Sequence, residues 1–83
     1  METTIRFLVE LTPRAEKILQ EAPKEARRMG AEGFVGVEHI FLAILQEGES
    51  VPAQLLSQLG MSNVIRAELE KVLRSEEYRG TGR

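Results

Sequence analysis

The chain has 83 residues, a formal net charge of −2 and no cysteine. This length fits one small domain, the missing cysteines exclude disulfides and thiolate metal sites, and the charge gives no reason to expect nucleic acid as a partner. All thirteen acidic residues are Glu, which tolerates helix interiors better than Asp does. Because there is also no run of β-branched residues, we expect an all-α fold: a compact bundle of four to five helices.

No apolar segment approaches the roughly 20 residues needed to span a bilayer, and no signal-peptide pattern follows Met1. We therefore expect no membrane association and a cytoplasmic location. A domain of this size buries only about 60% of the surface of its unfolded chain, so its stability is marginal without further contacts. Oligomerisation is one source of such contacts.

A short extended arm is predicted at the N-terminus, over residues 1–11. Ile5, Phe7, Val9 and Leu11 alternate with other residues, although one further apolar side chain interrupts the pattern. Such alternation is typical of a half-buried extended segment. Two interpretations remain open. The arm packs across the helices of its own chain, or it pairs as a strand with its copy in a second protomer.

The first helix is predicted to begin at Thr12-Pro13, which supplies an N-cap hydroxyl and a proline at the first helical position. One apolar stripe follows at helical spacing: Ala15, Ile18, Leu19, Ala22, Ala26 and Met29. Gly30 fits a C-terminal cap in the left-handed region. Pro23 lies inside this pattern, where it removes the hydrogen bond to the Leu19 carbonyl at a cost of roughly 3 kcal/mol. We expect a kink or a break there.

The second helix is predicted from about Val37 to Glu47, before Gly48. Every residue from Ile40 to Leu45 is apolar. A helix that is apolar all round lies in the middle of a core. This helix is therefore the element around which the bundle should assemble.

A third helix is capped by Ser50 or Val51, with Pro52 in its first turn and Gly60 after its end. Its predicted buried side is Leu55, Leu56 and Leu59. Ser62 is the predicted N-cap of a fourth helix, whose apolar face holds Ile65, Leu69, Val72 and Leu73. The helical domain then covers residues 12–75, and residues 76–83 are predicted to be a frayed, flexible tail.

The sequence offers almost no catalytic chemistry, and we assign no catalytic residue, no metal ligand and no cofactor. His39 is the only histidine, and Glu38-His39 lacks the second His of a zinc-binding helix. No Ser lies in a nucleophile elbow. We interpret His39 as a structural residue, hydrogen-bonded at the edge of the core. A catalytic role is the alternative.

A candidate ligand site is predicted at the start of the second helix, at Gly36, Val37, Glu38 and His39. Free amides at a helix N-terminus attract anions, and a glycine lets a ligand approach the backbone. A carboxylate beside a phosphate site suits a ligand that carries phosphate and guanidinium together, because the guanidinium can pair with Glu38. The alternative is that Glu38 is simply a first-turn acid that complements the helix dipole.

From Leu11 to about Leu73 the chain resembles one repeat of the amino-terminal domain of Clp ATPases, closest to the ClpC type. The resemblance depends on these segments: Thr12-Pro-Arg-Ala-Glu-Lys-Ile-Leu19, Glu25-Ala-Arg-Arg28, Val35-Gly-Val-Glu-His-Ile-Phe-Leu42, Glu47-Gly48 and Leu56-x-x-Leu59-Gly60. They cover about three quarters of the chain, in the order and spacing of the family.

The resemblance implies two four-helix repeats related by a pseudo-twofold axis, on an AAA+ unfoldase that feeds a protease. It also implies that the domain receives adaptors and substrates. In the ClpC type it recognises phosphorylated arginine, toward which the residue matching Glu38 acts. This sequence differs in having one repeat, no ATPase module with its Walker motif, and Val37 in place of the usual threonine. The substitution removes a helix-capping hydroxyl.

Two functions of different class are expected from this comparison. The first is a non-catalytic module that binds a protein or peptide partner of the Clp system: a phosphoarginine-marked substrate, an adaptor or a small ligand. The alternative is a structural or regulatory protein that docks on a Clp ATPase or another partner without reading peptides. We also expect a homodimer, because two copies on a true twofold axis could replace the two repeats of the family.

Overall fold

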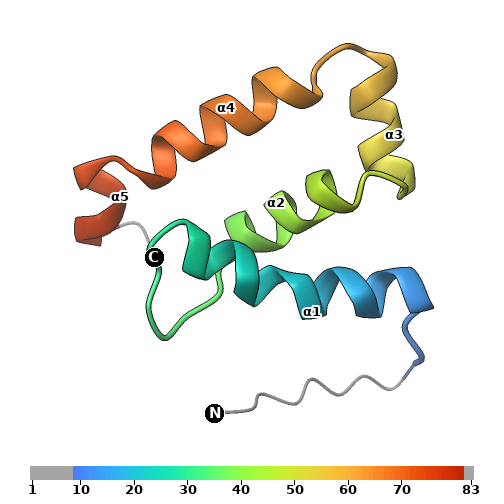
Figure 1. The fold of residues 1–83 in the computed structure, drawn as a ribbon, viewed down its shortest axis with the longest axis horizontal. Helices are drawn as coiled ribbons and strands as arrows, with labels where there is room; N and C mark the ends of the chain where they lie inside the picture. The colour runs from blue at the N-terminus through green and yellow to red at the C-terminus, as the bar shows by residue number, and fades with distance from the viewer. Residues whose placement is uncertain (1–8, 82–83) are drawn as a thin grey trace.

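The computed structural model describes residues 9–81, with side chains as far as Tyr78, and the regular structure in this range is entirely helical (Figure 1). Its five helices are α1 (Pro13–Arg28), α2 (Val37–Glu47), α3 (Val51–Gln58), α4 (Ser62–Leu73) and α5 (Glu76–Thr81). The all-α fold of four to five helices is therefore confirmed. Most of the predicted N-terminal arm lies outside the described residues, so neither interpretation of it is tested.

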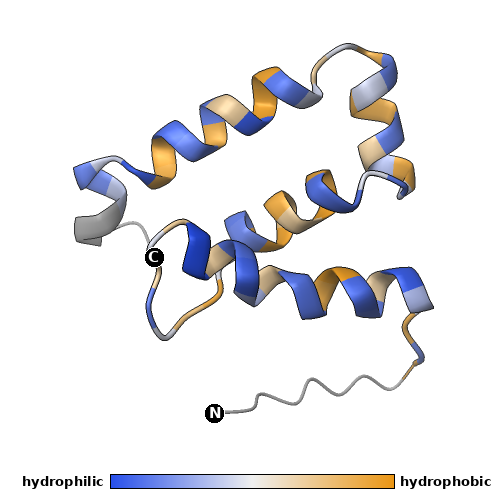
Figure 2. Ribbon diagram, in the orientation of Figure 1, coloured by the Kyte–Doolittle hydropathy of each residue, from blue (hydrophilic) through white to orange (hydrophobic). Residues whose placement is uncertain are grey.

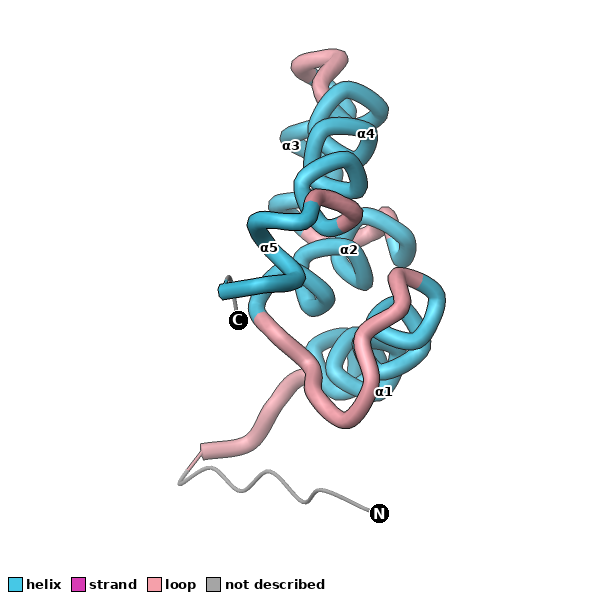
Figure 3. The backbone as a smooth tube through the Cα atoms, turned by 90° about the vertical axis from the view of Figure 1, so that its left-hand side faces the viewer, coloured by secondary structure: helices cyan, strands magenta, loops and turns pink. Residues whose placement is uncertain are grey.

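The helices form a flat arrangement, with principal extents of 37, 37 and 18 Å. Figures 1 and 3 show α2 between α1 on one side and α4 on the other, with α3 joining α2 to α4 at one end. The packing of α2 against α1 is the most extensive between any two described helices, and α2 also approaches α3 and α4. The apolar second helix is thus central, as its sequence predicts.

Local capping accounts for most helix boundaries. The Thr12 hydroxyl accepts from the Ala15 N–H at 3.1 Å, and the Ser50 hydroxyl accepts from the Ala53 N–H at 3.3 Å. Gly48 ends α2 at φ 77°, in the left-handed region where glycine is the favoured residue. The fourth helix departs from expectation by one residue: Ser62 is its first residue, and Met61 is an N-cap without a side-chain hydrogen bond.

The chain does not break at Pro23, because α1 continues through this residue to Arg28. Of the two expected alternatives, a kink or a break, the break is therefore wrong and the kink stays a prediction. Ala22 and Ala26, on either side of the proline, are almost completely buried. Their burial, with the close packing of α1 on α2, offsets the hydrogen bond that a proline cannot donate.

Two apolar clusters form the core, and α2 contributes to both. One contains Met29, Leu42, Leu45 and Leu73; the other contains Ile18, Ala22 and Ala43. Apolar residues accordingly appear all along α2 in Figure 2. The leucines of the third helix are a correction: Leu55 is 53% exposed and Leu59 is 73% exposed, and only Leu56 packs against the core.

The exposed residues Val51, Leu55 and Leu59 follow one another at four-residue spacing and form a single stripe on α3, called here the α3 stripe. A short helix at the corner of a flat molecule turns only one face toward its neighbours, which explains why the opposite leucines remain outside. Val72, assigned to the buried face of the fourth helix, is likewise 51% exposed.

The segment expected to be a tail from residue 76 is helical as far as Thr81. Ser75 joins α5 to α4: its hydroxyl donates to the Val72 carbonyl at 2.7 Å and accepts from the Tyr78 N–H at 3.2 Å. The Tyr78 side chain packs against the core cluster of Met29 and Leu73. A serine cap and one aromatic anchor therefore extend the folded part of the chain beyond residue 75.

Candidate functional site

The N-terminal end of α2 is organised by His39. Its Nδ1 accepts a hydrogen bond from the Gly36 N–H at 2.8 Å, its side chain is only 1% exposed, and its ring lies 5.6 Å from that of Phe34. A side chain at the third helical position that satisfies the N-cap amide is one half of a capping box, a role usually held by Glu or Gln. The hydrogen bond expected for His39 at the edge of the core is therefore present, which supports the structural interpretation.

The hydrogen bond also defines the protonation state of His39. Because Nδ1 accepts, the proton of the neutral ring is on Nε2. Burial lowers the pKa of His39 below its ordinary value, and the nearby carboxylates of Glu38 and Glu25 oppose this shift without reversing it. The imidazole is therefore held neutral as part of the helix cap.

Glu38 is half-buried, and its main partner comes from the other end of the chain. The Tyr78 hydroxyl donates to Glu38 Oε2 at 2.6 Å, across 40 residues of sequence. This hydrogen bond is the main reason that the pKa of Glu38 lies below its ordinary value; its own backbone N–H also lowers the pKa, and burial opposes both. The carboxylate is thus ionised at neutral pH and tied to α5.

The Glu38 side chain folds back over Gly36. A Cβ atom built on Gly36 would lie 2.9 Å from Glu38 Oε2, so a larger residue here would require the Glu38 carboxylate to move. Glycine at this position therefore makes room for the carboxylate of the same protein. The space that the sequence predicts for a ligand is thus used by the Glu38 carboxylate.

The backbone amides at this end of α2 are less available than expected. The His39 N–H donates to the Gly36 carbonyl at 3.0 Å, so it does not point outward. The Glu38 N–H faces the carboxylate of its own residue and lowers the pKa of that carboxylate. Among the described residues, no hydrogen-bond acceptor faces the amide of Val37, whose side chain is 76% exposed. Of the amides of Val37, Glu38 and His39, only that of Val37 is thus available to a ligand.

A cavity of about 260 Å³ lies next to this end of α2. Its walls are the loop from Met29 to Phe34, the ring of His39, Leu73 at the end of α4, and Tyr78. Tyr78 therefore both lines the cavity and holds Glu38. Within the part of the chain that the structure describes, no cluster of side chains is suited to a metal ion, and no helix is long and apolar enough to cross a membrane.

Among the described buried or half-buried glutamates, Glu38 is the one whose side-chain partner is not a cation. The other four each contact a cation: Glu21 with Lys24, Glu25 with Arg28, Glu47 with Arg14, and Glu70 with Arg28 and Arg74. Glu38 instead contacts a neutral phenol. Its carboxylate thus carries a charge for which the described residues supply no guanidinium or ammonium group.

Residues 8–79 match the family model of the Clp repeat (R) N-terminal domain, and the chain belongs to this family. The similar proteins are much longer than this chain. The chain is 41% identical over 78 residues to the negative regulator of genetic competence ClpC/MecB of Bacillus subtilis, covering 93% of this chain and 9% of that protein. It is 41% identical over 70 residues to the chaperone protein ClpB of Oceanobacillus iheyensis, covering 83% and 8%.

A plant relative gives the same picture: the chloroplastic chaperone protein ClpC1 of Oryza sativa is 38% identical over 76 residues, covering 89% of this chain and 8% of that protein. The chain therefore spans less than a tenth of the length of these relatives. No solved structure matches it significantly. The family membership and the all-helical repeat confirm the resemblance inferred from the sequence motifs.

The sequence predicts Glu38 as a site residue but not Tyr78, because residues 76–83 are predicted to be a tail. A local signal was present. Ser75 is followed by Glu76 and Glu77, and a serine before two acidic residues is a common start of a helix. No local pattern, however, indicates that the aromatic residue of that helix returns to the start of α2.

Proposed function

We propose that this protein is a non-catalytic binding module of the Clp chaperone and protease system that recognises proteins bearing phosphoarginine. Membership of the Clp repeat family supports a protein partner from that system. One observation supports the specific ligand: the ionised Glu38 carboxylate, beside the exposed end of α2, contacts no cation among the residues that the structure describes. A guanidinium group is its natural partner.

The phosphate of such a ligand would lie at the α2 N-terminus. The dipole of an 11-residue helix places about half a positive charge there, and the Val37 N–H is available as a donor. Because only one of the three expected amides is available, phosphate binding in the present conformation should be weak. The guanidinium contact at Glu38 then contributes most of the selectivity. The proposal places this activity in the cytoplasm, where the module acts as an adaptor.

Calorimetric titration with free phosphoarginine tests the proposal, with arginine and phosphoserine as comparison ligands. We expect wild-type protein to bind phosphoarginine and Glu38→Ala to lose at least about tenfold in affinity, the effect of one charge-assisted hydrogen bond. Glu68→Ala, which removes an exposed carboxylate on α4, is the matched control and should bind as the wild type does. Equal binding by Glu38→Ala would contradict the site.

We also propose that the protein forms a homodimer through the α3 stripe. A small flat domain buries little surface, and Val51, Leu55 and Leu59 present a continuous apolar row to solvent. Isologous pairing of two such rows covers both at once. The alternative function, docking on a Clp ATPase or another partner without reading peptides, would use the same row. It predicts one stoichiometric partner in co-purification and no binding of phosphoarginine.

A further inference from the structure

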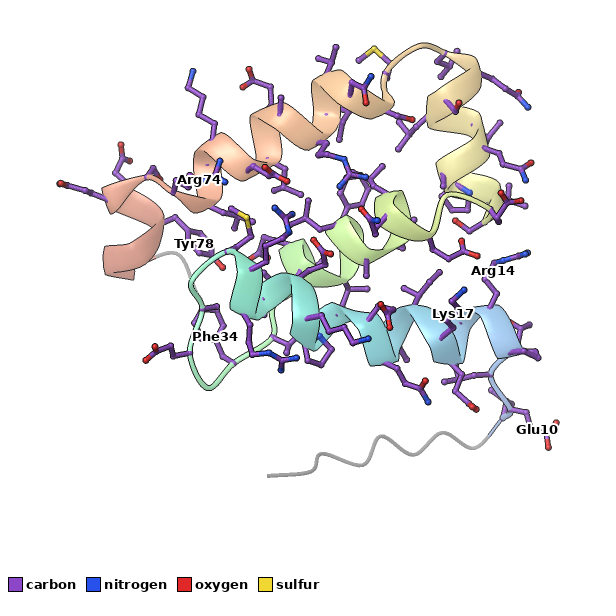
Figure 4. All side chains as sticks on the ribbon, in the orientation of Figure 1. Glu10, Arg14, Lys17, Phe34, Arg74 and Tyr78 are labelled. Atoms are coloured by element: carbon purple, nitrogen blue, oxygen red, sulfur yellow. The ribbon has the colours of Figure 1, made fainter. Side chains whose placement is uncertain are left out.

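The last described helix, α5, contacts the candidate site through Tyr78. No sequence motif connects this helix with the start of α2. Tyr78, on α5, reaches the start of α2 and lies beside the loop that carries Phe34 (Figure 4). The Tyr78 hydroxyl donates a hydrogen bond to Glu38 Oε2 at 2.6 Å. The contact is short and charge-assisted, as expected for a phenol that donates to a carboxylate.

The helix that carries Tyr78 is short and has one close neighbour among the described helices. Among the described helices, α5 closely approaches only α4. It has six residues, which is too short to be stable by itself. The contacts that hold it include the Ser75 hydroxyl, the packing of the Tyr78 ring and the phenol–carboxylate hydrogen bond. Removal of one of these should loosen it without unfolding the core formed by α1, α2 and α4.

We propose that α5 is an intramolecular occupant of the Glu38 site and that a ligand guanidinium must displace Tyr78 to bind. This inference rests on the proposed function. A guanidinium that pairs with a carboxylate in the bidentate manner uses both oxygens, and one of them already accepts from Tyr78. The two donors therefore compete, and α5 weakens binding until the ligand, or a partner that draws α5 away, releases the carboxylate.

Tyr78 also provides the measurement, because it is the only tyrosine and the chain has no tryptophan. A carboxylate hydrogen-bonded to a phenol quenches tyrosine emission. We expect weak emission from wild-type protein and stronger emission from Glu38→Gln, whose neutral amide is a poorer quencher. This comparison requires no ligand, so it tests the contact independently of the proposed function. Equal emission from the two proteins would overturn the occupancy of Glu38 by Tyr78.

The competition is tested with phosphoarginine and two variants. Tyr78→Phe keeps the ring in the core and removes only the hydroxyl. It should bind about tenfold more tightly than wild type, by the value of one hydrogen bond to a charged group. Ser75→Ala loosens α5 without touching the phenol and should shift affinity in the same direction. In wild-type protein, phosphoarginine should raise the Tyr78 emission as it binds.

The outcomes separate this inference from the proposed function. If wild type binds phosphoarginine and Tyr78→Phe binds it equally or more weakly, Tyr78 is no competitor and the inference fails while the function stands. If neither protein binds, the proposed function fails and the competition fails with it. The emission of wild type against Glu38→Gln then still decides whether α5 is held by Glu38. Circular dichroism of each variant confirms that the helices are intact.

Discussion

His39 links the stability of the fold to pH. Its ring caps α2 through Nδ1, which can accept from the Gly36 N–H only while the ring is neutral. Protonation would place an N–H against an N–H in a site that is 1% exposed. The same residue that begins the central helix is therefore its point of acid sensitivity.

We predict that stability falls as the pH is lowered from 7.5 to 5.5. The folded pKa of His39 lies below its unfolded value of 6.5, so its contribution is complete above about 6.5 and is lost as the pH falls toward the folded pKa, by at most about 1.4 kcal/mol per pH unit. Urea unfolding at several pH values measures this loss. Because the chain has one histidine, His39→Gln should remove the dependence. A dependence that persists in His39→Gln would contradict the prediction.

At the scale of the elements, α1 and α4 are joined by side chains. The Arg28 guanidinium contacts Glu25 on its own helix and Glu70 on α4, both at 2.8 Å. These contacts raise the pKa of Arg28 and lower that of Glu70. Because Glu25 is 9% exposed, its carboxylate needs this partner more than a surface residue would.

We predict that Arg28→Ala lowers the free energy of unfolding by about 1–2 kcal/mol, because it leaves the Glu25 carboxylate buried without its cation. The loss stays within this range because solvent screens the exposed part of the ion-pair network. The neighbouring Arg27→Ala removes an exposed arginine and should change stability by less than about 0.5 kcal/mol. Chemical denaturation of both variants measures the difference. Equal effects would show that the bridge contributes nothing beyond surface charge.

Because α1 continues through Pro23, the effect on stability of replacing this proline can be predicted. Alanine at this position would donate the missing hydrogen bond to the Leu19 carbonyl, within a helix that already continues through this residue. We expect Pro23→Ala to raise the free energy of unfolding by about 1–2 kcal/mol, after allowance for the greater freedom that the variant gains when unfolded. Thermal unfolding tests this. A lower or unchanged melting temperature would mean that the proline conformation itself stabilises α1.

For the whole molecule, the flat shape and the α3 stripe predict self-association. We expect light scattering at micromolar concentration to show twice the mass of the 9.3 kDa chain. Leu59→Glu places a charge at one end of the apolar row and should yield the monomer. Gln58→Glu adds the same charge beside it, on an exposed polar position of α3, and should leave the dimer intact. A monomeric wild-type protein would contradict the homodimer, and the α3 stripe would then be a surface for a different partner.

Local patterns in the sequence determined much of this protein. Thr12-Pro13 and Gly48 begin and end helices as predicted, since caps act between residues three or four positions apart and are encoded in adjacent letters. The same patterns indicated the family and led to Gly36–His39 as the candidate site. Only the tertiary structure decided that α1 runs through Pro23, because burial against α2 outweighs the propensity of a single residue.

Tertiary packing also decided which apolar residues face solvent and what Glu38 contacts. Leu55 and Leu59 have the spacing of a buried face, but a helix at the corner of a flat molecule has no neighbour on that side. Tyr78 meets Glu38 across 40 residues. No sequence period or motif spans such a distance. The contact exists because α4 runs back beside α2 and brings α5 toward the start of α2 (Figure 1). The direction in which α4 runs is decided by how the helices pack and not by the local sequence.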